Sequence, residues 1–274
     1  MKREIKELVK RYKIFPSKRL GQNFLINRKI IEKIIRWSEL SQKDTVLEIG
    51  AGIGNLTSEL AKGVKRVIAI EKDKRLIPIL KERLGELKNV EIVEGDVLKI
   101  DFEKLKINSV YKVVANLPYY ITSPILRLFL EKINKKPQFL ILMVQKELAQ
   151  RVCAKAPKMN LLAVSVRVFA KEVKILSLIP KKYFWPKPKV DSAILKISQI
   201  EPLISEKERE VFFKILKAGF SHPRKQIINN LAENLKIEKE EIKNWLLENK
   251  ISPFLRPENL DIKEWLALAK NYKF

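Results

Sequence analysis

The stretch ANLPYYITSP, residues 115–124, combines residue types that could hold a flat molecule carrying an amine. It follows the hydrophobic run YKVV, which predicts a buried strand that ends on the amide of Asn116. Pro118 fixes the backbone directly after this strand, and Tyr119 adds an aromatic ring. The amide oxygen and a rigid backbone carbonyl can accept the two hydrogens of an amine while the ring stacks on the group that bears it. The stretch therefore predicts a site for an amine on a planar ring.

A second motif, VLEIGAGIG, predicts a loop that binds a nucleoside. Gly50 and Gly52 follow a strand-like run and precede a helix-like run, so the backbone can turn tightly and approach a ligand closely. Glu71 ends the next strand-like run, where a carboxylate can accept both hydroxyls of a ribose. Asp96 ends the third run, in EGDV, and can accept a hydrogen bond from the amino group of adenine.

The spacing of the glycines argues against a dinucleotide. The loop reads G-x-G-x-G, and Asn55 stands where the dinucleotide fingerprint has its last glycine. A nucleoside without a pyrophosphate fits this loop best, and S-adenosylmethionine is the leading candidate.

The amine on a nucleobase is a poor nucleophile because its lone pair is delocalised into the ring. Asn116 would draw that nitrogen toward tetrahedral geometry, and orientation of this kind can lower a barrier by roughly 7–11 kcal/mol.

The elements that must position these residues follow from alternating hydrophobic patterns. Short hydrophobic runs alternate with helix-like stretches, which predicts a doubly wound, mostly parallel Rossmann-like α/β sheet. Two later runs around the proline-rich turn PKKYFWPKPK predict an antiparallel hairpin at the sheet edge. The pattern becomes helical near residue 201. We therefore expect an α/β domain over residues 1–200 and a small helical domain over 201–274. The five central runs lie at 45–50, 66–71, 90–95, 111–116 and 138–144.

The composition points to a polyanionic partner. The 274 residues contain 56 lysine and arginine residues against 32 acidic ones, which gives a net charge of +24. Such an excess favours nucleic acid or an anionic membrane surface, although a lysine-rich proteome would also raise the lysine count. No hydrophobic run reaches the roughly 20 residues that span a bilayer. The N-terminus has no signal-peptide core, and Cys153 is the only cysteine, so we expect a cytoplasmic protein.

Eight motifs along nearly the whole chain resemble the ribosomal RNA adenine N6,N6-dimethyltransferase family, and within it the bacterial small-subunit branch. The chain differs from the usual family pattern at APKMNLLAVSV, which lacks a glycine-containing turn with a tyrosine, and at Pro223-Arg224-Lys225, which has one arginine before the lysine. The resembling motifs are KRLGQNFL (18–25), VLEIGAGIGNLT (46–57), IEKD (70–73), EGDVL (94–98), NLPYYITSPIL (116–126), MVQKELAQR (143–151), FWPKPKVDSA (184–193) and GFSHPRKQIINNL (219–231).

The resemblance implies a function, a set of site residues and a role for each domain: an S-adenosylmethionine-dependent methyltransferase domain with an N-terminal arm over residues 1–200, and an RNA-binding helical domain over 201–274. It implies transfer of methyl groups from S-adenosylmethionine, without a metal, to N6 of two adjacent adenosines near the 3′ end of small-subunit ribosomal RNA. The partners would be that RNA and the assembling small subunit, with no membrane, and the enzyme would be monomeric. Phe184 would face the flipped base opposite Tyr119. The amine would be handled by Asn116, the Leu117 carbonyl, Pro118 and Tyr119, and the cofactor by Asn23, Leu25, Gly50, Gly52, Glu71, Asp96 and Asn116.

Two other functions stay open from the sequence. One is the related large-subunit methylase that confers macrolide resistance, although the C-terminal motif and VDSA fit the small-subunit branch better. The other is an RNA-binding assembly or transcription factor that keeps the fold without catalysis. Purely structural roles are also open for single residues. Phe184 could pack as a core residue of the hairpin, and the lone His222 suits a turn better than the role of a general base.

Overall fold

The computed structural model describes residues 1–107 and 110–274, which form two compact units. The first unit consists of Met1–Ala149 and Lys174–Ile200, and the second of Gln150–Val173 and Glu201–Phe274. Residues 150–173 thus pack with the C-terminal helices, whereas the sequence pattern placed them before the boundary at residue 200. The reason is that hydrophobic side chains such as Phe169 stack on residues of the later helices, here Phe213 at 6.2 Å between ring centroids. The functional division into a methyltransferase and an RNA-binding domain stays a prediction.

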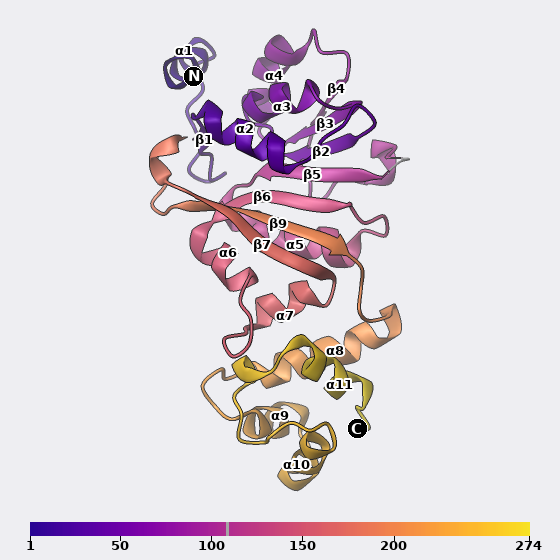
Figure 1. The fold of residues 1–274 in the computed structure, drawn as a ribbon. Coiled ribbons are helices and arrows are strands. Elements are labelled where there is room, and N and C mark those ends of the chain that lie inside the picture. The colour runs from indigo at the N-terminus through magenta and orange to yellow at the C-terminus, as the bar shows by residue number, and fades with distance from the viewer. Residues whose placement is uncertain (108–109) are drawn as a thin grey trace. The chain divides into compact units, whose positions relative to one another are not determined.

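The core of the first unit is a mostly parallel sheet of seven strands within the described residues (Figure 1). Strands β2 to β6 pair in parallel, and β9 pairs antiparallel to β6, so the expected fold class and edge hairpin are confirmed. Every residue of β2 is buried, as expected for a strand covered on both faces. The sheet order is β4 (Val90–Glu94), β3 (Arg66–Glu71), β2 (Thr45–Ile49), β5 (Tyr111–Asn116), β6 (Phe139–Gln145), β9 (Ser192–Ile200) and β7 (Ala170–Ile179).

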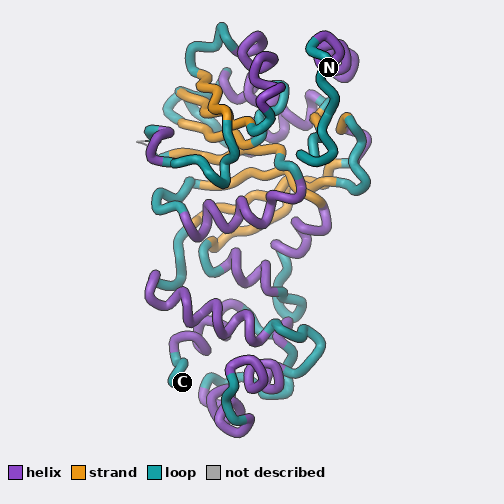
Figure 2. The backbone as a smooth tube through the Cα atoms, turned by 180° about the vertical axis from the view of Figure 1, so that it is seen from behind, coloured by secondary structure: helices purple, strands orange, loops and turns teal. Residues whose placement is uncertain are grey.

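Helices connect the strands of the sheet and form most of the second unit (Figure 2). In the first unit they follow the strand ends, so the loops at the carboxyl ends of β2 to β5 gather at one edge. This edge is where ligands bind in doubly wound folds. The helices are α1 (Lys2–Arg11), α2 (Arg28–Trp37), α3 (Asn55–Ala61), α4 (Ile77–Leu84), α5 (Thr122–Arg127), α6 (Lys146–Val152), α7 (Leu161–Arg167), α8 (Glu206–Gly219), α9 (Ile227–Leu235), α10 (Lys239–Glu248) and α11 (Ile262–Lys270).

A second, two-stranded sheet was not expected from the sequence. Strand β1 (Phe24–Leu25) pairs antiparallel with β8 (Phe184–Trp185), and the rings of Phe24 and Trp185 stack at 6.3 Å. The Ile26 amide also donates to the Tyr183 carbonyl at 2.8 Å. Two-residue strands give no alternating pattern to read. The pairing joins the N-terminal arm to the connection between β7 and β9, almost 160 positions later in the chain.

Helix α1 is fastened to the first unit by one apolar face and by ionic contacts. Ile5 and Val9 are buried, and Ile5 lies in one cluster with Leu76 and Ile79 beside α4. Glu82 of α4 accepts hydrogen bonds from Arg11 and Tyr12. The arm that follows α1 therefore starts from a fixed point.

The helices of the second unit pack around buried aromatic rings. Trp265 of α11 is 1% exposed and stacks on Phe220 at 5.2 Å between centroids. Gly219 ends α8 beneath this ring, and a Cβ atom there would lie 2.4 Å from Trp265 Cη2. Only a glycine lets α8 approach Trp265 this closely.

Gly219→Ala is therefore expected to destabilise the second unit. An added methyl group must displace a rigid buried ring, and overpacking of this kind costs about 1–3 kcal/mol, which outweighs the gain in helix propensity of about 1 kcal/mol. Urea unfolding followed by tryptophan fluorescence measures the difference. Gly63→Ala is the matched control, since a Cβ there meets no atom closer than 3.9 Å. Equal unfolding midpoints for wild type and Gly219→Ala would contradict this packing argument.

Candidate active site

The glycine loop between β2 and α3 brings the backbone close to the N-terminal arm. Gly50, Gly52 and Gly54 have φ values of +73°, +61° and +82°, a region that favours glycine. A Cβ atom on Gly52 would lie 3.3 Å from the ring of Phe24, so the loop also needs glycine for space. Gly50 and Gly52 line a pocket of the first unit, where the sequence predicted a ligand-binding loop.

Glu71 ends β3 in this pocket and is held by backbone donors. Its Oε2 accepts from the Gly52 amide at 2.7 Å, and its Oε1 accepts from the Asp73 amide at 2.7 Å. Burial raises the pKa of Glu71, while these two amides act in the opposite direction. The two bonds fix the carboxylate and leave further lone pairs on both oxygens. Such a carboxylate can accept two neighbouring hydroxyl groups.

Asp96 stands beside Glu71 in the same pocket and pairs with a lysine that the sequence analysis did not single out. Asp96 Oδ2 accepts from Lys72 Nζ at 2.8 Å, and Oδ1 accepts from the Leu98 amide at 3.1 Å. Partial burial acts to raise the pKa of Asp96, but the hydrogen bonds from Lys72 and Leu98 hold it below its ordinary value. The carboxylate is thus an acceptor at neutral pH, as binding of an adenine amino group requires.

The N-terminal arm forms one wall of the pocket and is held there by three side chains. Asn116 Nδ2 donates to the Asn23 carbonyl at 3.1 Å, and Asn55 Nδ2 donates to the Leu25 carbonyl at 3.2 Å. Gln22 Nε2 donates to Asp73 Oδ2 at 2.8 Å. Asn55 therefore holds the arm from the position at which a dinucleotide-binding loop carries glycine.

Arg83 of α4 links the glycine loop to helix α1. Its guanidinium donates to Asn55 Oδ1 at 2.8 Å and to the Ile53 carbonyl, and it lies 3.3 Å from Glu4 Oε1. One side chain thus contacts the glycine loop and α1 together. A long-range contact of this kind leaves no signal in a single sequence.

The stretch after β5 lies at the mouth of the pocket, as the sequence predicted. Asn116, Leu117, Pro118 and Tyr119 all line it. The Tyr119 hydroxyl is 2.8 Å from Ser192 Oγ, and Ser192 is fully buried as the first residue of β9. Because β9 runs antiparallel to β6, it begins where the parallel strands end. Burial raises the pKa of Tyr119, so the hydroxyl stays neutral.

Phe184 lines the pocket, but most of its ring belongs to the core. Only 3% of the side chain is exposed, and it packs in a cluster that includes Leu25 and Ile31. The structure thus combines the two roles considered from the sequence, a wall of the pocket and a plug of the hairpin. Contact with a flipped base stays a prediction for Phe184, as do the other site assignments.

Glu48 is a buried acid that the sequence analysis left aside. It lies in β2, is 2% exposed, and lines a small cavity of about 40 Å³ behind the glycine loop together with Asn55 and Asn116. Burial, with a contribution from the charge of Glu71, raises the pKa of Glu48 from 4.5 to about 8. A neutral Glu48 next to the loop keeps a second negative charge away from Glu71 at neutral pH. The sequence feature that could have indicated a buried acid here is the glutamate within the hydrophobic run VLEIG.

The donor and acceptor set fits a nucleoside cofactor such as S-adenosylmethionine. Glu71 can take the ribose hydroxyls and Asp96 the adenine amino group, while Ile49, Ile70 and Val97 supply apolar lining. Two carboxylates in one pocket disfavour a pyrophosphate. Within residues 1–107 and 110–274, no cluster of three or more histidine, cysteine, aspartate or glutamate residues could hold a metal, and no helix there could span a membrane.

Comparison with known proteins identifies the family. The ribosomal RNA adenine dimethylase family matches residues 16–273. The chain belongs to this family. It is 42% identical over 271 residues to ribosomal RNA small subunit methyltransferase A of Dehalococcoides mccartyi strain CBDB1, covering 98% of this chain and 92% of that protein. It is 42% identical to the protein of the same name from Clostridium botulinum strain Langeland, covering 96% of each.

Solved structures agree with the dimethylase family. A dimethyladenosine transferase from Plasmodium falciparum has a TM-score of 0.73 and 30% identity, covering 89% of this chain and 95% of that one. The 23S rRNA methyltransferase ErmE has a TM-score of 0.72 and 28% identity, covering 90% of this chain and 98% of that one. The resemblance on which the sequence analysis rested is thereby confirmed for the adenine dimethylase family.

Glu48→Gln is expected to change how stability depends on pH. The pKa of Glu48 is about 8 in the folded protein, above its ordinary value of 4.5. The stability that the bound proton contributes to the folded state is therefore complete below pH 4.5 and is lost as pH rises toward 8. Glutamine stays neutral, so its advantage over wild type should grow by at most about 1.4 kcal/mol per pH unit in that range. Chemical unfolding from pH 5 to 8 measures this, and a constant difference would contradict it.

The Tyr119–Ser192 hydrogen bond is expected to hold the aromatic ring for stacking. Tyr119→Phe, Ser192→Ala and the double variant should each lower single-turnover methyl transfer by a similar factor of about 2 to 10, the worth of one hydrogen bond. Tyr272→Phe is the control, because that tyrosine is not among the residues that line the pocket. If the two single losses multiplied in the double variant, the hydroxyls would act independently and the positioning role would be wrong.

Proposed function

We propose that this member of the dimethylase family transfers methyl groups from S-adenosylmethionine to N6 of two adjacent adenosines near the 3′ end of small-subunit ribosomal RNA, giving N6,N6-dimethyladenosines during assembly of the subunit. The observation that carries the proposal is one pocket that combines the Glu71 and Asp96 acceptors with Asn116 and Tyr119 at its mouth. We further propose that the enzyme acts as a monomer in the cytoplasm.

Bound S-adenosylmethionine would supply an electrophilic methyl group. The chain would then align the amine with two acceptors, Asn116 Oδ1 and the Leu117 carbonyl. Because the Asn116 nitrogen already donates to the Asn23 carbonyl, its oxygen is the atom left to face the amine. Tyr119 would stack on the base, which must leave its own stack to reach the pocket. No residue need act as a strong base, since the methylated amine is a cation that loses its proton readily.

Relatives favour the small-subunit substrate over the large-subunit one. The two proteins named small subunit methyltransferase A share 42% identity with almost the whole chain, whereas the 23S rRNA methyltransferase ErmE shares 28%. A binding factor without catalysis has less support, because all the residues expected to bind the cofactor except Leu25 line one pocket, together with those expected to handle the amine. Comparing purified small- and large-subunit RNA as substrates would separate the two enzymatic alternatives.

Substitutions of Glu71 and Asn116 test the two halves of the proposal. Glu71→Ala should weaken S-adenosylmethionine binding at least about 10-fold in calorimetry, since hydrogen bonds to a charged group are each worth about 1.5–3 kcal/mol. Asn116→Ala should slow methyl transfer to unmethylated small subunits at least about 100-fold, and more than it weakens cofactor binding, because it removes orientation.

The exposed Asn134, which lies away from the pocket, gives the control variant Asn134→Ala. Near-normal dimethylation by Asn116→Ala would rule out the mechanism. Wild-type protein that binds cofactor and RNA but transfers no methyl group would favour the binding-factor alternative.

A further inference from the structure

The positive charge of the chain is distributed very unevenly. Residues 1–200 contain 42 lysine and arginine residues against 20 acidic ones, whereas residues 201–274 contain 14 against 12. The helical C-terminal part thus contributes +2 to the net charge of +24. Electrostatic attraction of a polyanion must therefore come mainly from the part of the chain that holds the pocket.

Two cationic segments border the pocket, and we call them together the rim. One is Lys13–Arg19, directly before the arm residues Leu20–Phe24 that line the pocket. The other is Lys182–Lys189, which contains the pocket residue Phe184. Within residues 1–107 and 110–274, none of the exposed rim cations forms an ion pair with an acidic side chain, so all are available to phosphate. They are Lys13, Lys18, Arg19, Lys182, Lys187 and Lys189.

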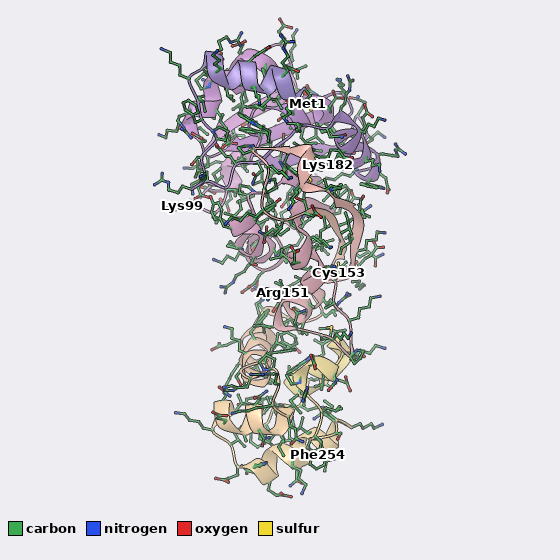
Figure 3. All side chains as sticks on the ribbon, turned by 90° about the vertical axis from the view of Figure 1, so that its left-hand side faces the viewer. Met1, Lys99, Arg151, Cys153, Lys182 and Phe254 are labelled. Carbon is green, nitrogen blue, oxygen red and sulfur yellow. The ribbon has the colours of Figure 1, made fainter. Side chains whose placement is uncertain are left out.

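The small β1–β8 sheet places the two segments side by side. Phe24 pairs with Trp185, and Leu25 pairs with Phe184. Ile14 is buried in the same cluster as Phe24, against which Trp185 also packs. Lys13 and Phe15, on either side of Ile14, therefore emerge next to the connection that carries the lysines. Figure 3 shows Lys182 at the same end of the first unit as Met1 and helix α1.

Phe15 is an exposed aromatic residue on an ordered segment. Its side chain is 80% exposed, and it lies between buried Ile14 and a tight turn. In that turn, the Ser17 amide donates to Gln22 Oε1 at 2.7 Å and the Gln22 amide donates to the Ser17 carbonyl at 3.2 Å. An exposed aromatic ring among cations is the arrangement on which single-stranded nucleic acid stacks its bases.

We propose that the rim is the docking surface for the single-stranded RNA that flanks the target adenosine, with phosphates on its cations and one unstacked neighbouring base on Phe15. The location in the pocket rests on the proposed function, but RNA binding at the rim does not require methyl transfer. The pocket contains the carboxylates of Glu71 and Asp96, which repel phosphate, while the rim attracts it. This separation of charge favours an RNA pose with the base inside and the backbone on the rim.

Charge removal on the full-length chain tests the rim. The triple variant Lys18→Gln, Lys182→Gln, Lys187→Gln is compared with Lys217→Gln, Lys239→Gln, Lys263→Gln, which removes three exposed charges from the C-terminal helices. Affinity is measured across a salt series for a short single-stranded RNA containing two adjacent adenosines. The rim triple should reduce the magnitude of the log–log salt slope by about 2, at about 0.7 per lost phosphate contact, and the control triple should not.

Phe15→Ala tests base stacking on the aromatic ring separately from the phosphate contacts of the rim cations. It should weaken binding of the same RNA by about 5- to 150-fold, which corresponds to about 1–3 kcal/mol for stacking of one base, with an unchanged salt slope. Equal slopes for the rim triple and wild type, or equal losses in both triples, would overturn the proposal. Cofactor affinity should stay at the wild-type value in the rim triple. If the rim effects appear but wild type transfers no methyl group, only the proposed function fails.

Discussion

The site depends on the hydrogen bonds that hold the N-terminal arm against the ends of the parallel strands. Asn116, from the end of β5, and Asn55, from the start of α3, each donate to a carbonyl of the arm. Only the nitrogen of an amide can donate, so the bond from Asn116 also fixes which way its oxygen points. The arm thus closes the cofactor side of the pocket and orients the proposed amine acceptor at the same time.

Burial of acids is the cost of this arrangement, and backbone amides offset it. Glu71 is 6% exposed, and an unpaired carboxylate at that depth would be strongly destabilising. The Gly52 and Asp73 amides supply one hydrogen bond to each oxygen, which the tight loop makes possible. At Glu48, burial raises the pKa to about 8, and the Thr57 side chain acts in the opposite direction. The two acids lie on neighbouring strands, and the groups that act against the effect of burial on their pKa values differ: backbone amides at Glu71 and the Thr57 side chain at Glu48.

The sequence predicted the strands well, because strands depend on local patterns, and most of the residues that it proposed for the site lie at one pocket. Strand β3 begins and ends at the residues of the run RVIAIE, and Glu71 and Asp96 both line the pocket. The contacts it could not predict join distant segments: the β1–β8 pair, the Arg83 bridge and the hydrogen bond from Tyr119 to Ser192. These depend on which loops meet at the sheet edge, and no periodicity encodes that. Residues 150–173 illustrate the same limit, since their packing partners come later in the chain.

The pocket and its surroundings have opposite charges, which suits a pair of ligands with opposite charges. Carboxylates in the pocket favour a cofactor that carries a positively charged sulfonium over a phosphate of RNA. The excess of cations lies outside, on residues 1–200, while residues 201–274 are almost neutral. Any selectivity that the helical part adds must then come from shape and hydrogen bonding, which are less sensitive to salt than phosphate contacts. Attraction to RNA in general and choice of a particular RNA would thus be assigned to different parts of one chain.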